Sequence, residues 1–102
     1  MAIVEVSITP LGTATPSVSQ YVARAHKILV ETPGLKAQLT PMSTVLEGDL
    51  DLILKAIRQA QEAVFAAGAL RVSTSIKIDD RRDRPGSMEE KVRRVQEQIG
   101  QR

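Results

Sequence analysis

Residues 35–49, LKAQLTPMSTVLEGD, decide the fold of this 102-residue chain. Side chains alternate in polarity from Leu35 to Thr40. Pro41-Met42-Ser43 follows directly and is predicted to form a turn. Thr44 to Gly48 then forms a second short segment of strand character. Two short strands joined by a turn predict a β-hairpin, so the fold is built around a hairpin in the middle of the chain.

A helix is predicted on each side of this hairpin. The first opens at Pro16-Ser17 and stops at Pro33-Gly34, while the second is capped by Asp49 or Asp51 and ends at Gly68. Apolar residues recur every three or four positions in both helices, which predicts one buried stripe on each. The stripes consist of Val18, Tyr21, Val22, Ala25, Ile28 and Leu29 in the first helix, and of Leu50, Ile53, Leu54, Ile57, Ala60 and Val64 in the second.

Two further strands are predicted outside the helices, over residues 2–9 and 71–79. Their alternation places Ala2, Val4, Val6, Ile8, Val72, Thr74, Ile76 and Ile78 inward. The element order β-α-β-β-α-β is the ferredoxin-like arrangement, in which right-handed crossovers put both helices on one face of the sheet. We therefore expect an α+β, two-layer sandwich with a four-stranded antiparallel sheet and a core over residues 2–80.

The C-terminal segment adds one more helix to this core. Residues 81–86 form a polar linker, and a helix over 87–99 is predicted to start with Ser87 and Glu90 at the spacing of a capping box. The apolar stripe of this helix is narrow. A chain of this length suits one compact domain, so we expect a single domain over residues 1–102, and the pattern does not say where the last helix packs.

Composition excludes several classes of function. The chain has no cysteine and one histidine, His26, so neither disulfides nor a zinc site is expected. The net charge is only +2 and there are two aromatic residues, which disfavours nucleic-acid binding. No apolar run approaches the about 20 residues of a membrane helix. The N-terminus is predicted to be a strand rather than a secretory signal, and we expect a cytoplasmic protein with no metal and no cofactor.

The sheet face opposite the helices is where the sequence places polar side chains. It is predicted to present Glu5, Ser7, Thr9, Lys36, Gln38, Thr40, Ser73, Ser75 and Lys77. Glu47 joins this face if Leu46 points toward the helices, and Ser43 and Thr44 then lie beside it. Three interpretations are open: a solvated face, a surface packed on another subunit, and a ligand pocket.

The run from Asp79 to Arg84 is the other polar feature. Arg81, Arg82 or Arg84 could hold an anion. A mutual network of salt bridges with Asp80 and Asp83 explains the same residues equally well. No glycine-rich phosphate loop is present, and the paired carboxylates need no catalytic role, so no catalytic residue is predicted.

Three tracts together resemble one family, the thiamine-binding-protein-like group, long described as uncharacterised. They are LTPMSTVLEGD at 39–49, IKIDDRRD at 76–83 and TPSVSQYVA at 15–23. The resemblance implies a ferredoxin-like fold, binding of thiamine or its hydroxymethylpyrimidine half in some members, and dimers that pair into tetramers. The residues predicted to bind the ligand are Ser7, Ser43, Thr44, Glu47, Lys77, Asp79 and Arg81.

The resemblance leads to a functional hypothesis of non-enzymatic binding. The chain would bind thiamine or a related pyrimidine as a carrier, a salvage component or a buffer. A carboxylate with nearby hydroxyls can accept from the exocyclic amine of an aminopyrimidine, as Glu47 beside Ser43 and Thr44 would. The competing hypothesis is a structural or regulatory module that assembles with itself and binds no small molecule.

Overall fold

The structure of the chain is a computed structural model that describes residues 1–14, 16–84 and 86–100. Thr15 and Pro85, which belong to predicted helix-opening and linker segments, lie outside this part of the chain. The described residues form the elements β1 (Ala2–Pro10), α1 (Ser19–Glu31), β2 (Lys36–Leu39), β3 (Thr44–Gly48), α2 (Leu50–Ala66), β4 (Val72–Asp80) and α3 (Met88–Gln98). The predicted order and the extra C-terminal helix are confirmed, with boundaries that shift by one or two residues.

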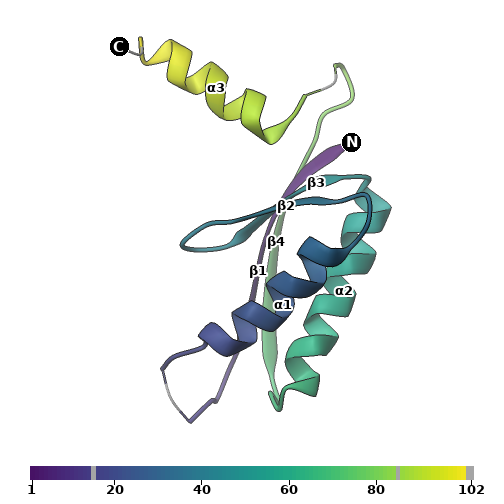
Figure 1. Ribbon diagram of the computed structural model, residues 1–102, viewed down its shortest axis with the longest axis vertical. Coiled ribbons are helices and arrows are strands. Elements are labelled where there is room, and N and C mark those ends of the chain that lie inside the picture. The colour runs from purple at the N-terminus through teal and green to yellow at the C-terminus, as the bar shows by residue number, and fades with distance from the viewer. Residues whose placement is uncertain (15, 85, 101–102) are drawn as a thin grey trace.

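The four strands form one antiparallel sheet in the order β2-β3-β1-β4. The register fixes which residues share a face: Ile3 lies opposite Glu47 of β3 and opposite Asp79 of β4. Helices α1 and α2 lie side by side against the sheet (Figure 1). The fold is therefore the predicted α+β, ferredoxin-like sandwich.

The core lies between this sheet and the two helices. The largest fully buried side chains are Leu29, Leu46, Ile53, Val4 and Val64. The alternation predicted for β1 is confirmed, because its inward side chains are buried while Glu5 is exposed. On β4 the expectation is only partly met. Ile76 and Ile78 have the inward register but are 43% and 45% exposed, since β4 is an edge strand with a neighbour on one side only.

Side-chain caps begin two of the helices as the sequence predicts. The Asp49 carboxylate accepts a hydrogen bond from the backbone N–H of Leu52 at 3.1 Å, and the Ser87 hydroxyl accepts one from the backbone N–H of Glu90 at 3.1 Å. Gly48, just before α2, lies close to the residues that precede β2. A Cβ added there would lie 2.7 Å from a methyl carbon of Leu35 and 3.1 Å from the carbonyl oxygen of Gly34, so the Leu35 side chain would have to move.

Helix α3 stands apart from the two core helices, near the N-terminus at one end of the molecule (Figure 1). The radius of gyration is 15.1 Å. A compact domain of this length has a radius of gyration of about 13 Å. The difference reflects the position of α3, which extends the molecule beyond the sandwich.

Candidate functional site

A cavity of about 730 Å³ lies between the sheet and α3. This volume falls within the about 300–1,000 Å³ typical of small-molecule sites. Its walls come from the start of β1, the end of β4, the linker and the first two turns of α3. The lining residues are Met1, Ile3, Asp79, Arg81, Arg82, Asp83, Arg84, Gly86, Ser87, Glu90, Lys91, Arg94 and Val95.

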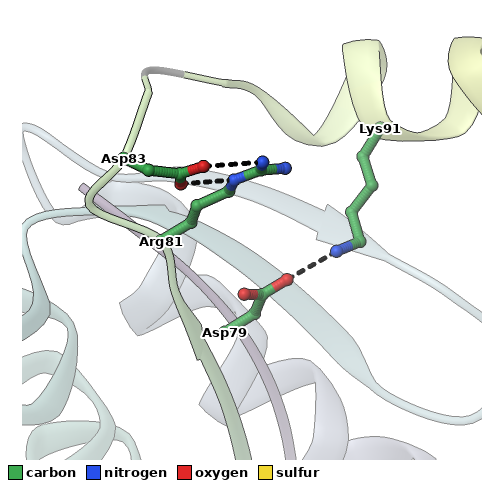
Figure 2. A network of polar contacts seen from close by, with 4 residues as sticks. All are labelled: Asp79, Arg81, Asp83 and Lys91. Atoms are coloured by element: carbon green, nitrogen blue, oxygen red, sulfur yellow. Dashed lines mark hydrogen bonds and ion pairs between the residues drawn. The ribbon is translucent and has the colours of Figure 1, made fainter.

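Ion pairs order the linker along one wall of the cavity. The guanidinium of Arg81 donates two hydrogen bonds to the carboxylate of Asp83, at 2.5 and 2.8 Å (Figure 2). These bonds lower the pKa of Asp83 from 3.8 to about 2. Arg82 pairs with Asp80 at 2.9 Å. The salt-bridge network that the sequence offered as one explanation of this run is therefore present.

Polar contacts also tie the start of α3 to the strand ends at one end of the sheet. Lys91 of α3 reaches Asp79 at the end of β4, with 2.5 Å between Nζ and Oδ2 (Figure 2). Glu47 accepts a hydrogen bond from the backbone N–H of Met88 at 2.6 Å, and Lys36 pairs with Glu89. Hydrogen bonding by Lys91, more than any other cause, lowers the pKa of Asp79. Since Glu47 and Asp79 share the face of Ile3, α3 begins on the side of the sheet opposite α1 and α2.

The structure divides the predicted site residues into two groups on this open face. Asp79 and Arg81 line the main cavity. Ser7, Ser43 and Lys77 line a smaller hollow of about 190 Å³. There the Ser43 hydroxyl donates a hydrogen bond to the carboxylate of Glu5 at 3.1 Å. Glu47 lines neither hollow, because its carboxylate is occupied by the start of α3.

Thr44 requires a correction. It was expected beside Glu47 on the open face, yet its side chain lies on the helix side of the sheet, where the residue is 6% exposed. Its hydroxyl contacts Nδ1 of His26 at 3.1 Å. Consecutive strand residues point to opposite faces, so with Leu46 fully buried, Thr44 must also point inward and Glu47 outward. This geometry gives Thr44 a structural contact with α1.

Four of the thirteen residues that line the cavity come from α3, and the sequence did not assign them to a site. Glu90, Lys91, Arg94 and Val95 all line it, and Arg94 pairs with Glu90 at 2.7 Å. The four-residue spacing of Glu90 and Arg94 could have predicted their pairing. No signal in the sequence could have placed them against β1 and β4.

Two kinds of feature are absent from the described residues. Residues 1–14, 16–84 and 86–100 contain no group of three or more histidine, cysteine, aspartate or glutamate residues arranged to hold a metal ion. Over the same ranges, none of the helices is long and apolar enough to cross a membrane.

Comparison with known proteins connects this geometry to a family. A family model described as "Thiamine-binding protein" matches residues 4–96. UPF0045 protein YqgV of Bacillus subtilis (strain 168) is similar, with 47% identity over 102 residues that cover 97% of this chain and 98% of the relative. The solved structure of the hypothetical protein MJ1052 of Methanocaldococcus jannaschii aligns with a TM-score of 0.81 and 42% identity, over 99% of this chain and 97% of the other. A Thermotoga maritima protein, named as a candidate for thiamine biosynthesis or salvage, aligns with a TM-score of 0.77 and 20% identity over 92% and 97% of the two chains, which supports the fold alone.

Proposed function

Because this chain belongs to the thiamine-binding protein family, whose model matches residues 4–96, we propose that it binds thiamine or a related pyrimidine such as hydroxymethylpyrimidine. The family match is the observation that carries the proposal. The protein acts as a carrier, a salvage component or a buffer, and it performs no chemistry on the ligand.

The cavity between the sheet and α3 is the proposed site. Ile3 and Val95 supply apolar surface for a heterocyclic ring, and Glu90 can accept from an exocyclic amine while it remains paired with Arg94. A carboxylate has about four lone-pair positions, so one ion pair does not exhaust it. The Ser87 hydroxyl accepts the N–H of Glu90 and keeps its own proton available for a ring nitrogen.

The position of the histidine supports a binding role without catalysis. His26 is the only histidine, and its ring lies on α1 against Thr44, on the opposite side of the sheet from the cavity. The most versatile general acid or base at neutral pH is therefore not at the proposed site.

Isothermal titration of the protein with thiamine and with hydroxymethylpyrimidine tests this proposal. We expect saturable heat with at least one of them and several-fold weaker binding in Glu90→Gln. Glu97→Gln is the matched control, since Glu97 lies on the same helix but does not line the cavity. The absence of saturable heat with both compounds, at concentrations that detect micromolar binding, would contradict the proposal.

A second candidate function, self-assembly, is favoured by apolar residues that the single chain leaves exposed. Val92 and Val95 of α3 and Ile99 at its C-terminal cap are 57%, 58% and 70% exposed. On the edge strand β4, Ile76 and Ile78 are nearly half exposed. Such surfaces are typical of contacts between subunits, and we propose a homo-oligomer, either a dimer or a tetramer. In the competing interaction-module hypothesis this assembly is the whole function.

Light scattering after size-exclusion chromatography tests assembly and separates the two functions. A clean monomer of 11.1 kDa would rule out the proposed oligomer. Val92→Asp adds a charge to the exposed stripe without changing a residue that lines the cavity. We expect this variant to dissociate, and retention of ligand binding by the dissociated protein would favour the carrier over the interaction module.

A further inference from the structure

The cavity between the sheet and α3 has an uneven balance of charge. Five of its lining residues are cationic and three are acidic, an excess of two positive charges. The cationic residues are Arg81, Arg82, Arg84, Lys91 and Arg94, and the acidic residues are Asp79, Asp83 and Glu90. A hollow lined by one predominant sign of charge raises the local concentration of ligands of the opposite sign.

The three acidic residues are already paired with cations of the cavity. Arg81 holds Asp83 through two hydrogen bonds. Lys91 contacts Asp79 at 2.5 Å, and Arg94 contacts Glu90 at 2.7 Å. A permanently cationic ring, such as the thiazolium of thiamine, would therefore meet carboxylates whose charge is neutralised by a neighbour. The cavity is poorly suited to recognise a ligand by positive charge.

Arg84 is the cation that remains. Among the described residues it forms no ion pair. The other two arginines of the linker are paired, Arg81 with Asp83 and Arg82 with Asp80. Arg84 lies close in sequence to Gly86 and Ser87, which also line the cavity where α3 begins. A guanidinium can bind a phosphate through two parallel hydrogen bonds.

We infer that the cavity selects phosphorylated ligands, namely the phosphate monoester of thiamine or of hydroxymethylpyrimidine, and that Arg84 binds the phosphate. This inference rests on the proposed function, because it specifies the ligand class of the same cavity. The heterocycle lies against Ile3 and Val95, and the phosphate lies at the linker side. The monoester adds negative charge to the ligand, which the excess positive charge of the cavity then balances.

Calorimetric titration with thiamine and with thiamine monophosphate, at low and at high salt, tests this inference. At low salt we expect the monophosphate to bind about tenfold more tightly than thiamine. This ratio corresponds to the lower end of the free energies measured for hydrogen bonds to charged groups. At about 1 M salt, where the screening length falls to about 3 Å, this preference should shrink. Arg84→Gln should remove most of the preference.

Arg93→Gln is the matched control, because it removes one exposed arginine of α3 that does not line the cavity. The control should keep the full preference for the monophosphate. Equal affinities for the two ligands, or equal behaviour of the two arginine variants, would overturn the inference and leave the proposed function standing.

Inorganic phosphate provides the third arm of the experiment. It should compete only weakly with the monophosphate, since it lacks the ring. Inorganic phosphate that binds as tightly as the monophosphate would overturn the assignment of a pyrimidine phosphate. Failure of thiamine, hydroxymethylpyrimidine and both of their monophosphates to bind would reject the proposed function together with the inference.

Discussion

Helices α2 and α3 begin in the same way and pack very differently. Each is amphipathic and each is capped by a side chain, Asp49 for α2 and Ser87 for α3. Five residues of α2 are buried against the sheet and α1, whereas Met88 is the only buried residue among those that the structure describes in α3. Both helices therefore follow from local sequence features, namely a side-chain cap and an amphipathic pattern. The width of the apolar stripe decides which helix joins the core.

The contacts that position the two helices differ in kind. Helix α2 is held by apolar burial, which stabilises in proportion to the area removed from water. Helix α3 is held by surface ion pairs and by the bond from Met88 to Glu47. Exposed ion pairs contribute about 0–1 kcal/mol each, so α3 is the element expected to detach first. A site built partly from α3 can thus open without unfolding the sandwich.

The largest test of this comparison truncates one apolar side chain in each helix. Ile53→Ala removes a fully buried side chain of α2 and should lower the free energy of unfolding by about 2–5 kcal/mol. Val92→Ala, at a residue 57% exposed on α3, should lower it by about 0.5 kcal/mol or less. Chemical denaturation at a low protein concentration measures both values. Similar losses in the two variants would mean that α3 is packed as firmly as α2.

An effect of intermediate size on amide exchange is expected from Glu47→Ala. This change removes the acceptor of the Met88 N–H, a bond to a charged group worth about 1.5–3 kcal/mol. The amides of α3 should exchange with solvent faster, while those of α2 stay protected, because only α3 loses a contact. Hydrogen exchange followed by mass spectrometry measures both helices together.

Glu62→Ala serves as the control for this variant, since Glu62 pairs with Arg58 on the exposed surface of α2. It should leave the exchange of α3 as it is in the unmodified protein. Faster exchange throughout α2 in Glu47→Ala would show that the two helices are not independent, contrary to the comparison.

The smallest expected effect is a pH dependence of amide exchange in α3. Lys91 lowers the pKa of Asp79 below its usual 3.8. A carboxyl with a lowered pKa in the folded state contributes stability that is fully present above the usual value and is lost as the pH falls through the lowered one. The contact between Asp79 and Lys91 should therefore weaken below about pH 3.8, and exchange of α3 amides should rise there. Asp79→Asn should reduce this dependence, and an unchanged profile in that variant would assign it to other groups.

The sequence alone predicted most of the sandwich because its signals are local. The hairpin, the Asp49 cap, the glycine that ends α2 and the alternation of β1 each depend on residues that are neighbours along the chain. The same reasoning failed for Ile76 and Ile78. Their alternation indicated the correct face. Their burial depends on which other elements cover the edge strand, and the residues of the strand alone do not determine that.

The candidate site was predicted only in part for the same reason. Asp79 and Arg81 were placed at the end of the last strand, where the cavity is, and the resemblance to the thiamine-binding-protein-like family suggested the class of ligand. Thr44 was grouped with Glu47, although alternation along β3 puts residues three apart on opposite faces. The burial of Leu46 then shows that Thr44 is the one that faces the helices.

The sequence by itself determined that a polar linker and a short amphipathic helix follow the last strand. Only the tertiary structure decided that this helix begins against the ends of the strands and lines a cavity with β1 and β4. Met88 meets Glu47 across 41 positions of the chain, and Lys91 meets Asp79 across 12. Helix formation depends on side chains one turn apart, whereas contacts over such separations exist only after the sheet has aligned its strands.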